Sequence, residues 1–563
     1  MSQRVLLLCS AENGLTRRAA AALRGAGRVV RTEVVAGSGE MDAAVAPADF
    51  DLIICPYLKS AVPEHITSRW TTLTIHPGPV GDRGPHSLDW AITNAEPRWG
   101  VTALTAVFEM DAGPVWAFRT FPLPRGCTKS AIYNTVVADA AVECILEASD
   151  KASDPRYVPV DQTDAPREIR GARPRSAMRQ SDRAIDWAGD ANTIARRINA
   201  ADGSPGVLTT LHTHPVYVHD AHPGNRIGRI GEPGTIVSRA YRRIEIACGT
   251  DTLWIGHLRA KSASDGCKGP ATNVLRRIGY PILTVPHNTV ATYRDIHYRR
   301  EGSSPIATIT IDAYNGAFDT SFCLRLADAI RFAGRQGTDV LVVRGTESNP
   351  HWCNGIHLGA IEHAVDPARE GWANITAINA VCRALLECTS QVTVAALTGS
   401  AGAGGAMLAL AADVVVARQR VLLNPHYATL GLTGSELHTF TLPHRVGSDR
   451  ARELLTECPS LDTVEAHRAN LIDHVGPDRE FDCWLDDLVR EYCRPTVRAA
   501  AMRAKCARLN VDLPPGRIDA ILTEELAQMS ADLFGDRHGF AARRYAFLRK
   551  IPQPDSVRVY RET

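Results

Sequence analysis

The chain has 563 residues, of which 45% are hydrophobic and 22% are charged, and its formal net charge is +1. This composition is typical of a globular protein, and the length corresponds to three or four domains. The small net charge offers no strong electrostatic field for nucleic acid or an anionic membrane. No apolar run is long enough for a membrane helix or a signal peptide, and the 14 cysteines include no Cys-x-x-Cys pair, so we expect a cytoplasmic protein with reduced thiols.

The N-terminal region alternates short apolar runs with helical sequence. The run at 5–9 predicts a strand buried on both faces, the runs at 29–35 and 51–58 predict two more strands, and the alanine-rich stretch 15–23 predicts a helix. This alternation predicts a doubly wound α/β sheet. The glycine fingerprint of dinucleotide-binding folds is missing after the first run, so we do not expect NAD as a cofactor.

A strand-like run that ends at His76 is followed by a loop rich in proline and glycine. Arg83 and Gly84 lie in this loop, and a helix is expected from near Ser87. Ligands of such sheets bind beyond the carboxyl ends of the strands, so this loop is a candidate site. Taken alone, His76 would be an ordinary buried histidine. The Asp111-Ala-Gly-Pro segment further along makes a functional role the stronger interpretation.

These motifs, in this order, resemble the formyltransferases that use 10-formyltetrahydrofolate. The resemblance implies that His76 donates a hydrogen bond to the oxygen of a tetrahedral formyl carbon, and that Asp111 orients the imidazole or relays a proton. Thr74, Arg83 and Gly84 are the implied folate-binding residues. Thr74 stands where the family has an asparagine, but its hydroxyl can still form a hydrogen bond.

The next segments predict the end of this domain and a second one. A helix at 130–148 closes the first domain, for which we expect the bounds 1–165, and a linker rich in proline and arginine follows. A helix at 191–200 and several short strands then resemble the small, OB-like β-barrel that follows the catalytic domain of folate formyltransferases. We expect this second domain at 183–280.

Four histidines in the second domain raise the question of a metal site, and they are His212, His214, His219 and His222. His212 and His214 share one strand face without an acidic or thiol partner, so we expect no metal.

The third predicted domain spans 304–563 and follows an irregular connector at 279–304. Strands are expected at 306–311 and 339–343, with a helix at 320–333 between them. A second helix is expected at 372–386, and a helical tail begins near residue 484.

A tight turn of small residues, Gly402 to Ala406, opens an apolar helix after the strand-like run 392–394. The first N–H groups of a helix have no internal partner, so one of them could bind a thioester oxygen. Alone, the turn would be explained better by tight packing than by a binding role. A second turn in Trp352-Cys-Asn-Gly-Ile-His-Leu358 strengthens the functional interpretation.

The two turns together resemble the enoyl-CoA hydratase/isomerase (crotonase) superfamily. The resemblance implies a crotonase-like α/β fold in which the Ile356 and Gly404 N–H groups hold a coenzyme A thioester. Asn354, Gly355 and Gly405 are the implied neighbouring binding residues.

Both catalytic glutamates of the hydratases are missing. Met407 stands at the first position, and Asn424-Pro-His-Tyr427 occupies the region of the second. We therefore expect no addition of water to enoyl-CoA.

The fusion of these two halves resembles the hydrogenase maturation family HypX, also called HoxX. The resemblance implies a bifunctional enzyme that transfers a formyl group from 10-formyltetrahydrofolate to coenzyme A and then splits formyl-CoA into carbon monoxide and coenzyme A. The carbon monoxide becomes a ligand of the iron in [NiFe]-hydrogenase. Small-molecule substrates are the expected partners, and other [NiFe]-hydrogenase maturation proteins are candidates.

For the second step, Glu436 is the candidate acid and base, Tyr427 a candidate donor and His426 a third candidate. Glu436 could instead be an acid at a helix N-terminus, because Gly434-Ser435 resembles a helix cap. Two other functions stay open: a formyltetrahydrofolate hydrolase or sugar-amine formyltransferase with a non-catalytic acyl-CoA module, and a scaffold for maturation proteins.

Overall fold

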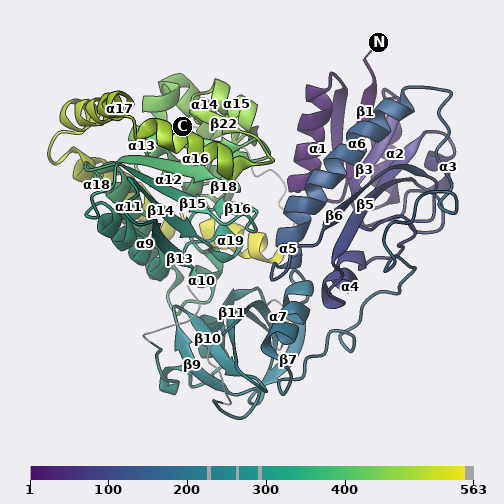
Figure 1. Cartoon of the computed structure of the whole chain (residues 1–563), viewed down its shortest axis with the longest axis horizontal. Coiled ribbons are helices and arrows are strands. Elements are labelled where there is room, and N and C mark those ends of the chain that lie inside the picture. Colours follow the sequence, from purple (N-terminus) through teal and green to yellow (C-terminus); the bar gives the residue numbers. More distant parts are fainter. Residues whose placement is uncertain (1, 225–229, 262–265, 289–294, 552–563) are drawn as a thin grey trace. The chain divides into compact units, whose positions relative to one another are not determined.

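The computed structural model describes residues 2–224, 230–261, 266–288 and 295–551 (Figure 1). The chain forms two compact units. The first comprises Met1–Thr209 and His219–His222, and the second comprises Thr210–Val218 and Pro223–Thr563. Within the described residues, no helix combines the length and the apolar character that crossing a membrane requires. The gaps fall within the second expected domain, in the connector and at the end of the third expected domain.

The first unit is built on a six-stranded sheet with the order β2-β1-β3-β4-β5-β6. Strands β1 to β4 run parallel, and β5 and β6 are antiparallel to their neighbours, so the predicted α/β fold is confirmed with a mixed sheet. The bounds are β1 (Arg4–Cys9), β2 (Val29–Val34), β3 (Leu52–Tyr57), β4 (Thr72–His76), β5 (Arg98–Thr105) and β6 (Val115–Pro122).

Helices cover both faces of this sheet. Along β1, Leu7 belongs to the core under α1 and α6, whereas Leu6 and Leu8 belong to the core under α2 and α3. Such a strand, buried on both faces, is what the continuous apolar run predicts. The helices are α1 (Gly14–Gly25), α2 (Ser38–Val45), α3 (Glu64–Thr67), α4 (Ser87–Thr93), α5 (Lys129–Ile132), α6 (Ala138–Ala152) and α7 (Ala191–Ala200), with a π-helical turn at Tyr133–Val137 between α5 and α6.

A middle sheet follows, with the order β7-β8-β11-β10-β9 and with β12 paired to β11. The expected short strands are present, and β10 pairs antiparallel with both β9 and β11. Strands β9 to β12 belong to the second unit. The bounds are β7 (Val207–Leu211), β8 (His214–Pro223), β9 (Ile236–Ala240), β10 (Arg243–Ala247), β11 (Thr252–Ala260) and β12 (Gly269–Pro270), followed by α8 (Ala271–Arg277).

The crotonase-like part of the second unit has a six-stranded sheet with the order β13-β14-β15-β17-β19-β22. All pairs are parallel except β13 with β14. The bounds are β13 (Ile296–Arg300), β14 (Ile306–Ile311), β15 (Val340–Gly345), β17 (Val392–Leu397), β19 (Val414–Arg418) and β22 (His474–Gly476). Strand β13 lies in the stretch that was expected to be an irregular connector. It was missed because its polar, half-buried residues give a weak strand pattern, as is common at a sheet edge.

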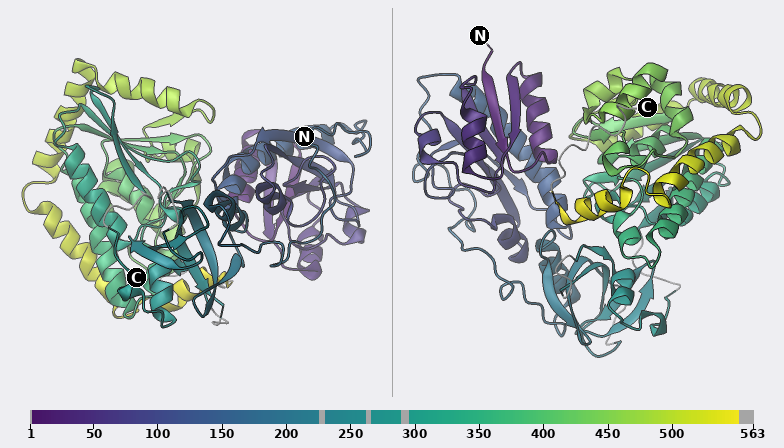
Figure 2. Two further views of the ribbon diagram at one scale, coloured as in Figure 1. Left: turned by 60° about the horizontal axis from the view of Figure 1, so that its bottom comes forward. Right: turned by 180° about the vertical axis from the view of Figure 1, so that it is seen from behind.

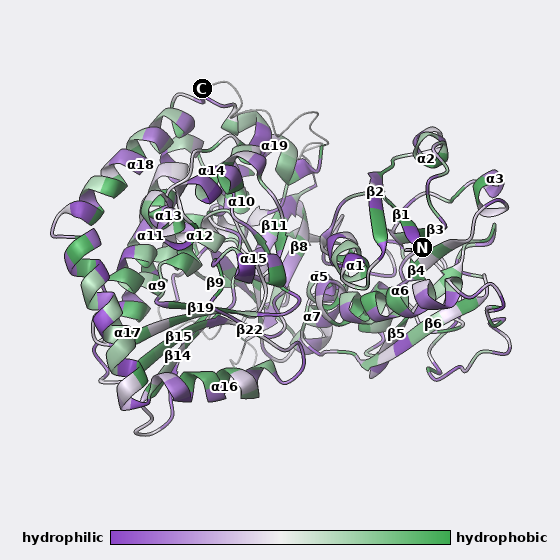
Figure 3. Ribbon diagram, turned by 90° about the horizontal axis from the view of Figure 1, so that it is seen from above, coloured by the Kyte–Doolittle hydropathy of each residue, from purple (hydrophilic) through white to green (hydrophobic). Residues whose placement is uncertain are grey.

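Two hydrophobic cores sandwich this sheet. On β15, Val343 packs in the core with α9 (Thr320–Ala333) and α11 (Pro367–Leu386), and Val342 packs in the core with α16 (Phe481–Tyr492). Figure 3 shows β14 and β15 as mostly hydrophobic strands. The interior strands therefore hold the turns that follow them in fixed positions.

A second, small sheet with the order β16-β18-β20-β21 lies at the ends of these strands and carries the predicted turns. Its strands are β16 (His351–Cys353), β18 (Ser400–Gly402), β20 (Leu422–Asn424) and β21 (Leu461–Asp462). The remaining helices are α10 (Leu358–Glu362), α12 (Gly404–Leu410), α13 (His438–Val446), α14 (Ser448–Glu457), α15 (Thr463–Arg468), α17 (Pro495–Ala507), α18 (Arg517–Leu533) and α19 (Phe540–Arg549). Figure 2 shows the C-terminal helices in yellow, and α18 packs against α11 and α13.

Candidate active sites

In the first unit, His76 is the last residue of β4 and its imidazole lies between two carboxylates. Nδ1 is 3.2 Å from Asp111 Oδ2, and Nε2 is 3.0 Å from Asp82 Oδ2. The His76 and Asp82 side chains are buried, and Asp111 is mostly buried. Each carboxylate can accept the proton of the ring nitrogen that it faces, so the three side chains form a connected path for a proton.

Asp111 is fixed by the loops around it. Its backbone has a φ of 56°, which is unusual for a residue other than glycine. The Gly84 N–H donates to Asp111 Oδ2 over 3.1 Å, and Gln162 donates to the Asp111 carbonyl over 2.7 Å. Gly84 has a φ of 114°, and a Cβ at this position would lie 2.2 Å from the Arg175 carbonyl oxygen. The glycine of the Arg-Gly motif therefore has a steric reason.

Thr74 and Arg83 are also predicted for this site, and the structure places them differently relative to His76. Thr74 precedes His76 by two residues on β4, so both side chains point to the same face of the sheet. Arg83 pairs with Glu109 over 2.9 Å, and both side chains are partly exposed. Arg83 is therefore available to a ligand at the rim rather than in the buried centre.

Asp82 was not predicted from the sequence. It appears there as one polar residue in a loop of prolines and glycines, and nothing in the pattern shows that the loop folds back onto His76. Its second oxygen, Oδ1, is buried and accepts no hydrogen bond from the described residues. A buried carboxylate oxygen without a donor is costly, and it is therefore a candidate acceptor for a substrate proton.

In the second unit, the two predicted turns lie side by side. Gly355 follows β16, and a Cβ built on it would be 3.2 Å from the Gly404 nitrogen. The N–H groups of Ile356 and Gly404 donate no hydrogen bond to a backbone or side-chain acceptor in the described part of the chain. Two such amides, one in a loop and one at the start of α12, can together hold a carbonyl oxygen.

Glu436 lies directly against the Gly404 turn. A Cβ at Gly404 would be 2.1 Å from Glu436 Oε1, so no side chain fits there while the carboxylate keeps its place. Tyr427 donates its hydroxyl hydrogen to Glu436 Oε2 over 2.8 Å, and the Ser435 N–H donates to the same oxygen over 3.1 Å. The carboxylate is thus held beside the position that a thioester carbonyl would occupy.

Burial controls the protonation of this pair. It raises the pKa of Glu436 to about 7, although the hydrogen bond from Tyr427 acts in the opposite direction. Burial, followed by the charge of Glu436, raises the pKa of Tyr427 well above its usual value. At neutral pH Tyr427 is therefore a proton donor in a hydrogen bond, and Glu436 can both accept and release a proton.

Two residues that were not predicted hold Glu436 in this position. Glu436 and Leu437 have positive φ values of 64° and 58°. Such conformations cost about 1–3 kcal/mol each and persist only where the surroundings enforce them. Asn379 accepts from the Glu436 N–H over 2.8 Å, and Glu525 of α18 accepts from the Leu437 N–H over 3.0 Å.

The alternative role of Glu436 as a helix-capping acid does not fit this geometry. Helix α13 begins at His438, and its first turn contains no acidic residue. Glu525 binds the first backbone amides instead, since it also accepts from the Thr439 N–H over 2.9 Å. The Glu436 carboxylate faces Tyr427.

The remaining predicted residues of this half lie around the turns. The Asn354 N–H donates to the Gly316 carbonyl over 2.7 Å, and Gly405 is the second residue of α12. Met407 is fully buried in the core, so it provides no polar group to the site. The Nδ1 of His426 is 3.3 Å from the Thr429 hydroxyl, on the chain segment just before Tyr427.

Comparison with known proteins supports both halves. Residues 301–512 match the family model "Enoyl-CoA hydratase/isomerase", and residues 177–267 match "Formyl transferase, C-terminal domain". The chain is 36% identical to the hydrogenase maturation factor HoxX of Bradyrhizobium diazoefficiens, over 98% of this chain and 95% of that protein. It is similar to the crystal structure of HypX from Aquifex aeolicus in complex with tetrahydrofolic acid, with a TM-score of 0.90, 32% identity and coverage of 100% of this chain and 99% of that chain. It is also 28% identical to a methionyl-tRNA formyltransferase of Trichlorobacter lovleyi, over 37% of this chain and 63% of that protein.

Proposed function

The chain belongs to the HypX/HoxX family of hydrogenase maturation factors, and on this basis we propose that it makes carbon monoxide in two steps. The first unit transfers a formyl group from 10-formyltetrahydrofolate to the thiol of coenzyme A. The crotonase-like part then cleaves formyl-CoA to carbon monoxide and coenzyme A. A relative from Aquifex aeolicus has been crystallised with tetrahydrofolic acid, which supports a folate substrate.

In the first step, the coenzyme A sulfur attacks the formyl carbon and the bond from that carbon to the folate nitrogen breaks. The thiol proton leaves and the folate nitrogen gains a proton, so no net proton is consumed. His76 keeps Nδ1 on Asp111, and its Nε2 donates to the oxygen of the tetrahedral carbon once the substrate displaces the Asp82 carboxylate from that nitrogen. The buried Oδ1 of Asp82 is a suitable acceptor for the thiol proton.

In the second step, the formyl hydrogen leaves as a proton and the carbon–sulfur bond breaks. The electron pair of the carbon–hydrogen bond stays on carbon as the lone pair of carbon monoxide, and the pair of the carbon–sulfur bond leaves with the thiolate. Glu436 takes the proton from carbon and returns it to sulfur. The Ile356 and Gly404 N–H groups hold the carbonyl oxygen, and Tyr427 holds Glu436.

One observation carries this proposal: a buried carboxylate with a pKa of about 7 lies against the Gly404 turn, while the hydratase position is the apolar Met407. Formyl-CoA has no α-carbon, so neither hydration nor isomerisation is available to it. A single group that moves a proton from carbon to sulfur is what its cleavage requires.

The direct test is to incubate the purified chain with 10-formyltetrahydrofolate and coenzyme A, and to trap carbon monoxide with a haem protein. We expect carbon monoxide in an amount equal to the folate consumed, and none when coenzyme A is omitted. Release of formate without any need for coenzyme A would instead indicate a formyltetrahydrofolate hydrolase. Absence of binding to both substrates would indicate a scaffold.

A further inference from the structure

We propose that His257, on strand β11 of the middle sheet, is a positioning residue for the Ile356 N–H. The middle sheet would then contribute to the proposed site of carbon monoxide release, in addition to following the formyltransferase domain in the chain. This inference rests on the proposed function for its effect on the reaction. The predicted effect of His257 on the loop that contains Ile356 is independent of the proposed function.

His357 follows Ile356 in the chain. Its hydrogen bonds determine which ring nitrogen accepts and which one donates. Its backbone N–H donates to Asn374 over 3.0 Å, and its Nδ1 accepts from the Ala360 N–H over 3.0 Å. A neutral ring that accepts at Nδ1 carries its hydrogen on Nε2. That Nε2 lies 3.0 Å from Nε2 of His257, which therefore acts as the acceptor.

Burial supports the neutral form of this ring. It lowers the pKa of His357 well below the usual value, and the nearby His257 and Arg242 act in the same direction. Both imidazole side chains are buried, and the rings are nearly parallel, with an interplanar angle of 11°. The contact therefore holds a single proton between the two Nε2 atoms.

His257 is itself held by its neighbours. Its ring packs on Tyr314 with the centroids 4.5 Å apart, and Lys268 donates to the Tyr314 hydroxyl over 2.8 Å. Its strand pairs with β12, where His257 lies opposite Pro270. A ring fixed in this way can set the position of His357, and through one peptide bond the direction of the Ile356 N–H.

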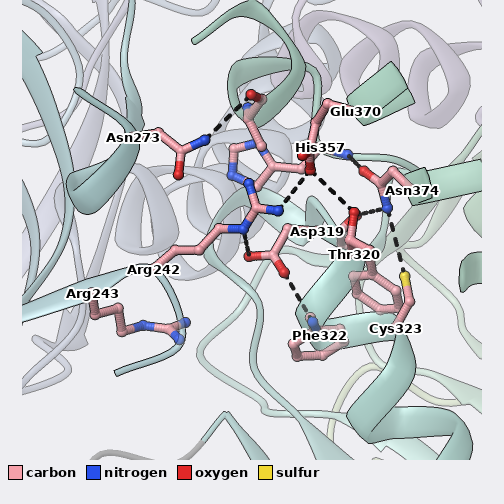
Figure 4. A network of polar contacts seen from close by, with 12 residues as sticks. Arg242, Arg243, Asn273, Asp319, Thr320, Phe322, Cys323, His357, Glu370 and Asn374 are labelled. Carbon is pink, nitrogen blue, oxygen red and sulfur yellow. Dashed lines mark hydrogen bonds and ion pairs between the residues drawn. The ribbon is translucent and has the colours of Figure 1, made fainter. Parts of the chain in front are cut away.

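A second contact from the middle sheet supports the other side of the same loop. Figure 4 shows Arg242 reaching towards Glu370 and Asp319, and its guanidinium lies 2.6 Å and 3.9 Å from their carboxylates. Asp319 follows Phe318, whose N–H donates to the Gly355 carbonyl over 2.9 Å. The peptide that carries the oxyanion N–H is thus connected to the middle sheet on both flanks.

Two substitutions separate the hydrogen bond from the bulk of the ring. His257→Gln retains an acceptor near the position of Nε2, whereas His257→Phe retains the packing on Tyr314 but has no acceptor. His214→Phe is the matched control, because His214 lies on β8 of the same sheet and its ring contacts Tyr280. All three variants should transfer formyl groups to coenzyme A at the wild-type rate, and thermal unfolding checks that their second unit is folded.

We expect His257→Phe to reduce the rate of carbon monoxide release from formyl-CoA by about 10-fold to 100-fold, the range for a misaligned donor. His257→Gln should recover most of the rate, and His214→Phe should match the wild type. Wild-type rates for His257→Phe, or equal losses for the Phe and Gln variants, would overturn the inference.

Hydrogen–deuterium exchange without substrate gives a readout that does not depend on the reaction. We expect the peptide that contains residues 353–360 to exchange faster in His257→Phe than in His257→Gln or the wild type. If the wild type released no carbon monoxide, the proposed function would fail and this exchange measurement would still decide the inference. Unchanged exchange in His257→Phe would contradict it.

Discussion

The imidazole of His76 faces Asp82 at 3.0 Å, and both side chains are buried in the first unit. Asp82 therefore adds a second carboxylate to the predicted pair of His76 and Asp111. We expect Asp82→Asn to slow formyl transfer to coenzyme A by about 100-fold or more, the usual contribution of a general acid or base. The rate is measured from the consumption of 10-formyltetrahydrofolate.

Asp111→Asn and His76→Ala are the companion variants and should also lose formyl transfer while still binding coenzyme A. Asp42→Asn is a suitable control, because Asp42 is exposed and pairs with the exposed His65. A wild-type rate in Asp82→Asn would exclude Asp82 from the reaction and leave His76 and Asp111 as the active pair.

Glu436→Gln should separate the two steps. The amide has nearly the same volume as the carboxylate but cannot take up a proton, so formyl transfer should continue while carbon monoxide release stops. Formyl-CoA should accumulate or hydrolyse slowly to formate. Formyl-CoA, formate and carbon monoxide are measured in one reaction. A full yield of carbon monoxide would move the search to Tyr427 and His426.

The rate of carbon monoxide release should rise with pH through about 7, because the pKa of Glu436 is raised to about 7 and the carboxylate is the base. Tyr427→Phe removes a hydrogen bond that stabilises this carboxylate, so the midpoint of the rise should move to higher pH. The measurement is the pH profile of kcat/KM with formyl-CoA. A profile that Tyr427→Phe leaves unchanged would contradict the assignment.

The same shift makes a prediction about folding. The folded state holds the Glu436 proton more tightly than the unfolded state, so Glu436 lowers the free energy of unfolding as the pH rises from about 4.5 to about 7, and no further above that. We therefore compare the free energy of unfolding of Glu436→Gln with that of the wild type at each pH. The variant minus wild-type difference should be larger at pH 8 than at pH 5 by an amount on the order of 1–3 kcal/mol. Urea unfolding at both pH values checks this, and equal differences at the two would contradict it.

Gly404→Ala should stop carbon monoxide release, because its Cβ would lie 2.1 Å from Glu436 Oε1 and would displace the carboxylate. Gly334→Ala is the matched control in the same half, where the nearest atom to the new Cβ is 3.5 Å away. Formyl transfer should persist in both variants. Normal release from Gly404→Ala would show that the carboxylate is not needed in its present position.

Crotonyl-CoA should not be hydrated, because Met407 is apolar and fully buried where hydratases have a glutamate. Loss of the enoyl thioester absorbance follows the reaction. Turnover on the order of 1 per second or faster, the usual range for enzymes, would contradict this expectation.

Much of the fold could be predicted because local pattern and burial agree. The apolar spacing of 320–333 gives helix α9 with these same bounds, and Asp319 caps it through the Phe322 N–H. The α/β class and the family resemblance are both confirmed. The roles of the predicted site residues remain predictions, although the structure does bring His76 to Asp111 and Glu436 to the Gly404 turn.

The supporting residues could not be predicted, because their contacts connect distant parts of the chain. Asn379 and Ser435 are 56 positions apart, and Glu525 and Leu437 are 88 positions apart. On their own helices, Asn379 and Glu525 look like ordinary polar residues. Only the packing of α11 and α18 around the Glu436 segment turns them into its supports.

The contact of Glu525 with the Leu437 and Thr439 amides has a consequence for the order in which the protein is made. A ribosome synthesises both oxyanion turns and Glu436 before it reaches α18, so for that interval the strained segment lacks the carboxylate that supports it. During synthesis, the formyl-transfer unit can be complete while the second site is still unformed. Under the proposed function, a nascent chain at this stage would produce formyl-CoA before it could release any carbon monoxide.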